Sequence, residues 1–382
     1  MAGMLTSPPM QRTRPPLQSW DIFCRVIDNY GDAGVCWRLA RQLVRVHGKS
    51  VRLWIDQPAT LRALCPTLVT DAARQQQEGI TVCHWPAQFP ATTAADVVIE
   101  AFACDLPPPY LQAMAARSTP PCWLNLEYLS AEPWIADCHG LASPHPSLPL
   151  TKYFFFPGFT ARSGGLLRES TATAATAATA DSTGQPFNLN LFCYANAPVT
   201  ALLNALGTAS WQINVSPGQP RQALGPHCSG NGPWQHGHHR INALPFLAPD
   251  AYDVLLRQGT VNIVRGEDSF VRAQLAGRPF LWHIYPQADN AHLDKLNAFL
   301  DIYTADLATE LARIVRAIFL AWNSPVTATH LAACWHDFHA ALPALAAHAR
   351  CWQAHCQQLP ELSAALVDFC QRLPSGHPGL AA

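Results

Sequence analysis

Two carboxylates lie close together in a polar turn near the start of the chain, between an apolar run and a helical pattern. Residues 21–27 (DIFCRVI) predict a buried strand, and residues 35–44 repeat apolar side chains at helical spacing. The turn between them contains Asp28, Asn29, Tyr30, Gly31 and Asp32. Two acids at such a place could exchange protons with a ligand. Helix capping by Asp32 and turn formation by Asp28 explain the same pattern equally well, so this motif alone leaves both interpretations open.

A second polar turn carries a cation beside its acids. Residues 261–264 predict a strand and residues 270–275 predict a helix. The turn between them contains Arg265, Gly266, Glu267, Asp268 and Ser269. A fixed guanidinium, a glycine and the free N–H groups of a helix start can bind a diphosphate, and Glu267 could face the same ligand. Acids that favour a helix start explain part of the pattern, but Arg265 favours a ligand-binding turn.

Two further stretches carry weaker signals. Tyr285 follows a predicted strand at residues 279–283 and could stack on a nucleotide, although a lone aromatic residue more often belongs to the core. The stretch 234–239 (WQHGHH) resembles a metal-binding tract, but no carboxylate or cysteine completes a ligand set at suitable spacing. We therefore interpret this stretch as a surface loop, and we predict no metal site.

Strands that alternate with helix-length spacers must position these turns. After the first strand, apolar runs occupy residues 51–55, 80–83, 96–100 and 123–128, and the rhythm restarts with runs at 188–194, 211–215, 240–245, 261–264 and 279–283. Such alternation indicates parallel sheets that are covered by helices on both faces. The predicted fold class is α/β, with two Rossmann-like doubly wound domains facing each other across a cleft, and with helices at the C-terminus.

A change of composition separates the two predicted domains. The Ala- and Thr-rich stretch at residues 170–181 has no side chain able to form a core, which is typical of a linker or an inserted loop. We predict a disordered tail at residues 1–18, a first domain at 19–169, a linker at 170–185, a second domain at 186–350, and a C-terminal helix at 351–382 that could pack back on the first domain.

Composition limits the classes of function. The chain has 382 residues, 49% of them hydrophobic and 13% charged, and a net charge of −1, so it has no charge excess suited to a nucleic acid or an anionic membrane. The first 18 residues contain no apolar signal segment, and no run reaches the roughly 20 apolar residues that span a bilayer. Several of the 13 cysteines, among them Cys24, Cys36 and Cys193, lie inside apolar runs, so we expect reduced thiols in a cytosolic protein. No pair has the C-x-x-C spacing of a zinc site.

Taken together, four stretches resemble one protein family. They are residues 21–32 (DIFCRVIDNYGD), 37–43 (WRLARQL), 265–269 (RGEDS) and 282–287 (WHIYPQ), and the resemblance extends over nearly the whole chain after Gln18. The family is that of the bacterial protein-arginine rhamnosyltransferases that modify translation elongation factor P. The resemblance implies a GT-B architecture and inverting transfer of L-rhamnose from dTDP-β-L-rhamnose to one arginine of that factor, which relieves ribosome stalling at proline runs. It implies no cofactor and no metal.

The resemblance also assigns roles to the acids. Asp28, Asp32 and Glu267 match the family's three essential acidic positions. A guanidinium is a poor nucleophile because it is protonated and delocalised, so carboxylates must orient it and accept a proton. We assign Asp32 as the base, Glu267 as the residue that orients the acceptor, and Asp28 as support for the loop and the sugar.

For the donor, the resemblance implies three groups of contacts. Asn29, Tyr30 and Gly31 would line the sugar, Phe192 and Tyr194 would pack on the thymine, and Arg265, Gly266, Asp268 and Ser269 would bind the diphosphate, with Tyr285 on the nucleotide. One position departs from the family: Pro249 stands where a glutamine usually contacts the base, and proline offers no such side-chain hydrogen bond.

Two other functions compete with this hypothesis. One is a sugar-nucleotide epimerase, or a GT-B transferase that acts on small glycans or lipids. The other is a non-catalytic module whose acidic loops bind basic partners. Binding of dTDP without binding of UDP would separate the three.

Overall fold

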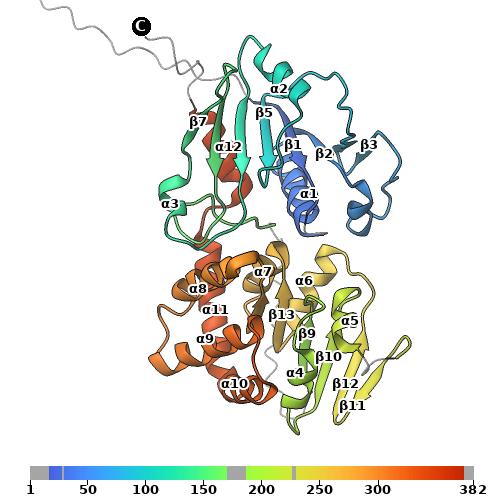
Figure 1. Cartoon of the computed structure of the whole chain (residues 1–382), viewed down its shortest axis with the longest axis vertical. Helices are drawn as coiled ribbons and strands as arrows, with labels where there is room; N and C mark the ends of the chain where they lie inside the picture. Colours follow the sequence, from blue (N-terminus) through green and yellow to red (C-terminus); the bar gives the residue numbers. More distant parts are fainter. Residues whose placement is uncertain (1–16, 28–29, 170–185, 226–228, 374–382) are drawn as a thin grey trace, which may run out of the picture.

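Two sheets flanked by helices make up the computed structural model of the chain, which describes residues 17–27, 30–169, 186–225 and 229–373. Figure 1 shows the two sheets one above the other, with the N-terminal half of the chain in the upper one. Each sheet has its own apolar core. The predicted α/β class with two Rossmann-like domains is therefore confirmed. The exact domain limits stay a prediction, and Asp28, Asn29 and the 170–185 linker lie outside the described residues.

The first sheet has the strand order β3-β4-β2-β1-β5-β6-β8-β7. Its inner strands run parallel, while β3 and β7 pair antiparallel at the edges. Inner parallel strands are covered on both faces, which explains why most of their residues are apolar and buried. The strands are β1 (Ser19–Cys24), β2 (Ser50–Ile55), β3 (Arg74–Gln77), β4 (Ile80–His84), β5 (Val97–Ala101), β6 (Cys122–Leu126), β7 (Ala142–Pro144) and β8 (Thr151–Phe155). The helices are α1 (Tyr30–Arg45), the short 3₁₀ helix η1 (Pro58–Ala63), α2 (Pro108–Ala115) and α3 (Ile135–Cys138).

The second sheet has the order β11-β12-β10-β9-β13-β14, parallel except for the β11–β12 hairpin. Its strands are β9 (Phe187–Leu191), β10 (Trp211–Val215), β11 (Trp234–His236), β12 (His239–Ala243), β13 (Val261–Arg265) and β14 (Phe280–His283). Its helices are α4 (Val199–Ala205), α5 (Gln219–Leu224), α6 (Pro249–Gln258), α7 (Glu267–Leu275), η3 (Ala288–Asn290), α8 (Ala291–Tyr303), α9 (Thr309–Asn323), α10 (Ala328–Ala340) and α11 (Leu342–Gln358).

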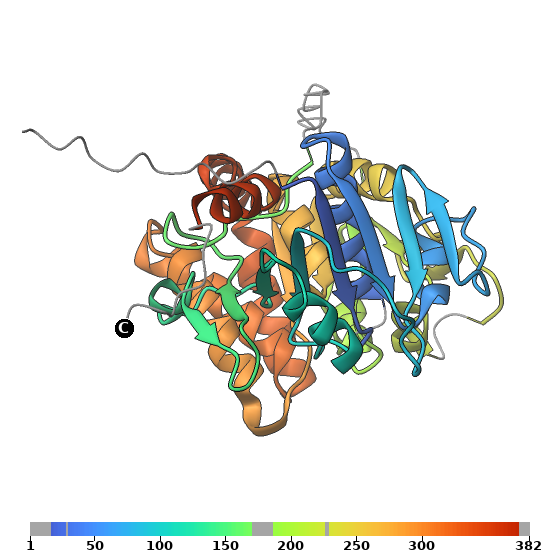
Figure 2. The same cartoon turned by 90° about the horizontal axis from the view of Figure 1, so that it is seen from above.

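The end of the chain returns to the first sheet. α12 (Leu362–Arg372) contributes Leu362, Leu366 and Cys370 to the core beneath α1, and Figures 1 and 2 show it beside the first sheet. Gly165 makes this return possible: its φ is +70°, and a Cβ there would overlap the carbonyl oxygen of Pro360. The predicted limit at residue 351 falls inside α11, because that helix continues to bury apolar side chains against the second domain as far as Gln358.

Three local predictions differ from the structure. The predicted strand 123–128 is β6 and ends at Leu126, so Tyr128 lies in the loop that follows. The histidine-rich stretch forms the β11–β12 hairpin rather than a loop, with Gly237 in the left-handed region at its turn. Leu17, which was predicted to belong to the disordered tail, instead buries its side chain in the first core.

Candidate functional site

Asp32 lies in the first turn of α1, directly beyond the carboxyl end of β1. Its side chain is only 2% exposed. Oδ2 accepts a hydrogen bond from the Ile27 N–H at 2.8 Å, and the Tyr128 hydroxyl donates to Oδ1 at 3.5 Å. The contact with Ile27 holds the turn before α1, but it is not a helix cap, because Asp32 lies inside the helix and accepts from a residue that precedes it. The contact with Tyr128 joins Asp32 to the loop after β6. Tyr30 and Gly31 are the first residues of the same helix.

Glu267 occupies the matching place in the second domain, as the first residue of α7. It follows Gly266, whose φ of +66° is a conformation that glycine adopts without strain. The Leu129 N–H donates to Glu267 Oε2 at 3.1 Å, so this carboxylate reaches across to the first domain. The loop after β6 therefore contacts two of the three predicted catalytic acids, Asp32 through Tyr128 and Glu267 through Leu129.

Sequence reasoning missed this loop. The loops after parallel strands meet at one edge of a sheet, where ligands of such folds bind, and that rule would have pointed to it. Placing Tyr128 inside the strand hid the signal. Phe102, at the start of the loop after β5, stacks on Tyr128 with ring centroids 4.5 Å apart, and its φ of +57° is unusual for a bulky residue. Strained backbone of this kind often accompanies functional sites.

Arg265 ends β13 and points its guanidinium at two aromatic rings. The guanidinium carbon lies 4.9 Å from the ring centre of Phe192 and 4.5 Å from that of Tyr194, and both rings follow β9, the neighbouring strand. The side chain is 7% exposed. Its Nε and Nη1 are buried and have no hydrogen-bond partner among the described residues. A desolvated cation with unused donors is suited to binding an anion, because burial makes an uncompensated charge costly.

His283, at the end of β14, holds this aromatic group in place. The Tyr194 N–H donates to its Nδ1 at 3.2 Å. Burial, together with the nearby charges of Arg265 and His292, lowers the pKa of His283 to about 4, so the ring is neutral and Nδ1 can accept. Tyr285 follows, half exposed, with its ring edge-on to Tyr194 at 5.6 Å. His283 had no predicted role, because nothing in the sequence marks it as a partner of a residue 89 positions away.

Asp268 does not face a ligand through its carboxylate. Its two oxygens accept from Arg38 of α1 and from Arg272 one turn further along α7. Burial alone would raise the pKa of Asp268, but Arg272 and Arg38 outweigh it and lower the pKa to about 2. A carboxylate also repels a diphosphate. Asp268 can therefore serve the predicted anion-binding turn only through its backbone, and the same holds for Gly266, whereas Ser269 retains a half-buried side chain.

Pro249 is the first residue of α6, a position where proline is well tolerated. One turn later, Tyr252 stands edge-on to Phe192 with ring centroids 6.2 Å apart. This ring extends the aromatic group beside Arg265 on the side where the family's glutamine is missing.

The described residues contain no group of three or more His, Cys, Asp or Glu side chains placed to hold a metal ion. Within the same ranges, no helix is long and apolar enough to cross a membrane. The described part of the site thus consists of two acids, one from each domain, that both contact the loop after β6, and of a cation set among aromatic rings in the second domain.

Known proteins match the chain over nearly its full length. Residues 20–371 match the protein family described as Elongation-Factor P (EF-P) rhamnosyltransferase EarP. A protein-arginine rhamnosyltransferase of Pseudomonas putida is 45% identical over 373 residues, with 92% of this chain and 98% of the relative covered. One of Pseudomonas aeruginosa is 42% identical over 384 residues, with 92% and 99% covered.

Solved structures agree with these relatives. One that concerns EarP-mediated arginine glycosylation of translation elongation factor EF-P has a TM-score of 0.58 at 30% identity, with 92% of this chain and 98% of that chain covered. The spinosyn rhamnosyltransferase SpnG, complexed with thymidine diphosphate, has a TM-score of 0.51 at 14% identity, with 92% and 99% covered, and this likeness concerns the GT-B fold alone. On the family match and on the identity to curated relatives, the chain belongs to the EF-P rhamnosyltransferase family EarP.

Proposed function

We propose that this protein transfers L-rhamnose from dTDP-β-L-rhamnose to one arginine side chain of translation elongation factor EF-P, with inversion at the anomeric carbon. Family membership supports the reaction class and the acceptor. The observation that supports a nucleoside-diphosphate sugar as substrate is Arg265, a buried guanidinium between two aromatic rings with N–H groups that have no hydrogen-bond partner among the described residues.

The donor half of the proposal follows from charge. A nucleoside diphosphate leaves with its negative charge on the β-phosphate, and GT-B folds neutralise that charge with helix starts and basic side chains. Arg265 and the N-terminus of α7, which begins at Glu267, supply both features side by side. Phe192 and Tyr194 offer faces on which a base can stack. The reaction then needs neither a metal nor another cofactor, and dTDP-β-L-rhamnose is the only small-molecule substrate.

The acceptor half follows from the chemistry of arginine. A protonated guanidinium must be oriented and must lose a proton as the new C–N bond forms. We assign proton acceptance to Asp32, orientation of the acceptor to Glu267, and support of the turn and sugar to Asp28. Acids from both domains suit this task, since the donor is held by the second domain and the acceptor must approach from the opposite face of the sugar for inversion.

The biological setting follows from the acceptor. Modified EF-P would act on ribosomes that stall at proline runs, and we expect the enzyme to work in the cytoplasm, with a protein acceptor and no nucleic acid or membrane partner.

Mass spectrometry of intact EF-P tests the proposal. Incubation with this protein and dTDP-β-L-rhamnose should add one deoxyhexose, which peptide mapping should place on arginine and NMR should show as the inverted anomer. Asp32→Asn and Glu267→Gln should abolish most of the transfer, whereas Asp137→Asn, an exposed carboxylate paired with Arg162, should not. No mass gain with an active donor would refute the function, and near wild-type rates in the Asp32 variant would refute the assigned base. Binding of UDP as tight as that of dTDP would favour a different transferase or an epimerase.

A further inference from the structure

Two helices that begin with the proposed catalytic acids are joined by a buried ion pair. α1 carries Asp32 in its first turn, and Arg38 lies further along the same helix. α7 begins with Glu267, followed directly by Asp268. Arg38 Nη1 pairs with Asp268 Oδ1, so this ion pair directly links the two helices that carry the acids.

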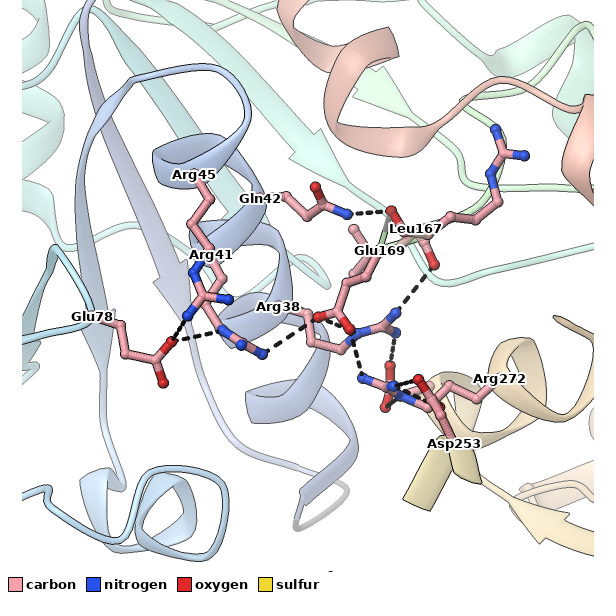
Figure 3. A network of polar contacts seen from close by, with 11 residues as sticks. Arg38, Arg41, Gln42, Arg45, Glu78, Leu167, Glu169, Asp253 and Arg272 are labelled. Atoms are coloured by element: carbon pink, nitrogen blue, oxygen red, sulfur yellow. Dashed lines mark hydrogen bonds and ion pairs between the residues drawn. The ribbon is translucent and has the colours of Figure 1, made fainter. Parts of the chain in front are cut away.

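This pair belongs to a wider network of charges between the domains. Arg38 Nε lies 3.5 Å from Glu169 Oε1, and its Nη2 donates to the Leu167 carbonyl oxygen at 3.4 Å. On the other side, Arg272 pairs with Asp268 at 2.9 Å and lies 3.7 Å from Glu169 Oε2. Figure 3 shows Arg38 and Arg272 on either side of Glu169, with the side chain of Asp253 against Arg272. The first-domain segment before the linker is thus tied to both helices.

The charges in this network are shielded from water. Arg38 is 3% exposed and Arg272 is 4% exposed. Asp268 stays ionised because the two arginines lower its pKa to about 2. Buried charges of opposite sign attract strongly, and the planar fork of arginine fixes the direction of each contact, so such a network tolerates little displacement.

Apolar packing near this contact leaves a gap. A cavity of about 30 Å³ lies between the domains, lined by Arg38 and Asp268 together with apolar residues such as Leu129 and Val271, and Glu267 also borders it. Because a cavity removes packing contacts, it does not resist sliding of one helix past the other. The ion pair between Arg38 and Asp268 is a directional contact that joins the two helices themselves, whereas the Leu129 N–H holds only the Glu267 side chain.

We propose that Arg38 is a positioning residue that aligns Asp32 with Glu267 by pairing with Asp268. The inference rests on the proposed function, since it takes those two acids as the catalytic ones. Arg265, Phe192 and Tyr194 all belong to the second domain, so loss of the pair should leave donor binding intact. Loss of the pair should instead slow transfer, because small misplacement of catalytic groups has a large effect on rate.

Kinetics of four variants test this role. Arg38→Gln and Asp268→Asn should each lower kcat about tenfold or more, and the double variant should fall no further than the worse single variant, as expected for residues that act as one unit. The Kd for dTDP should stay within about twofold of wild type, because a tenfold change would need 1.4 kcal/mol of lost contact. Arg38→Lys should be intermediate, since a lysine can pair with Asp268 but cannot also reach Glu169 and Leu167.

Arg41→Gln is the matched control. Arg41 lies on the same helix and, like Arg38, lies 3.5 Å from Glu169 Oε1, but its close partner at 2.9 Å is Glu78 of its own domain and not Asp268. The proposal is overturned if Arg41→Gln slows transfer as much as Arg38→Gln, or if the effects of Arg38→Gln and Asp268→Asn multiply. It is also overturned if dTDP binding falls in step with kcat, as a general loss of structure would cause. If Arg38→Gln does not fold, Arg38→Lys and the Asp268→Asn variant give the same comparison. Wild-type protein that fails to modify EF-P would instead refute the proposed function.

Discussion

Arg265, at the end of β13, and Arg272, on the helix α7 that follows, are both buried cations, but they differ in their partners. Arg272 contacts the carboxylates of Asp268, Asp253 and Glu169, two of them at 2.9 Å or closer. Arg265 faces only aromatic rings, and two of its nitrogens have no hydrogen-bond partner within the described part of the chain.

The difference separates a structural charge from a functional one. A buried charge with several partners holds elements together, whereas a buried charge without partners lowers stability unless a ligand compensates it. Proteins keep such an unfavourable residue where function needs it. Arg272 therefore belongs to the ion-pair network between the domains, whereas for Arg265 we propose a role in binding the donor anion.

The largest expected effect is on the stability of Arg272→Met. Removing this cation leaves Asp253 without its arginine partner and leaves Asp268 with Arg38 alone, and we expect a loss of about 3–5 kcal/mol in the free energy of unfolding. Chemical denaturation followed by fluorescence measures it. Arg313→Met is the control, because Arg313 pairs with Glu310 at the exposed surface and should leave the transition unchanged. Equal stability of the two variants would remove the contrast between the arginines.

Arg265→Gln should show the reverse pattern. We expect dTDP to bind about 100-fold more weakly, since at least one or two charge-assisted hydrogen bonds of about 1.5–3 kcal/mol each are lost. Stability without ligand should equal or exceed that of wild type, because an unpaired buried charge disappears. Calorimetric titration and thermal unfolding measure the two quantities, with the exposed Arg240→Gln in the same domain as the control. A drop in stability like that of Arg272→Met would make Arg265 a structural residue.

A smaller effect concerns the pH dependence of stability that comes from His283, which supports the aromatic group beside Arg265. The folded-state pKa of His283 is lowered to about 4, against an ordinary value of about 6.5. Between these values the unfolded chain binds the extra proton and the folded protein does not, so stability rises with pH across this window. The contribution of neutral His283 to stability should be fully present above about pH 6.5 and should be lost as the pH falls toward 4. His283→Asn should flatten that slope in pH-dependent unfolding; an unchanged slope would show that His283 titrates normally.

The smallest effect should come from Tyr285→Ala. Tyr285 is half exposed and touches Tyr194 only by its edge, so stability should not change. Loss of one stacking face for a nucleotide should weaken dTDP binding by about 1 kcal/mol, roughly fivefold. The same titration used for Arg265 detects this. Binding as weak as that of Arg265→Gln would mean that aromatic contacts, and not the cation, dominate donor recognition.

Local signals predicted much of the fold and part of the site. The predicted strand at 261–264 is found and extends through Arg265, whereas the helix predicted at 270–275 begins earlier, at Glu267. These elements could be located from the sequence because apolar periodicity acts within a few residues. The grouping of Phe192 and Tyr194 with Arg265 came from the resemblance to a family, since their strands are neighbours in the sheet but distant in the chain.

Other parts of the site depended on packing. Asp268 was predicted to serve the diphosphate, but its carboxylate is occupied by Arg38, a residue 230 positions away. The contact of Glu267 with the backbone of Leu129 and the support of Tyr194 by His283 likewise join distant segments. Sequence alone could not assign these partners, because several acids and bases compete for each one.

The amino-acid sequence by itself determined the alternating strands and helices, the two polar turns and the family. The tertiary structure alone decided which arginine is paired and which is left for a ligand. The physical reason is range: backbone conformation responds to neighbours along the chain, whereas the partner of a buried charge depends on the elements that folding brings beside it.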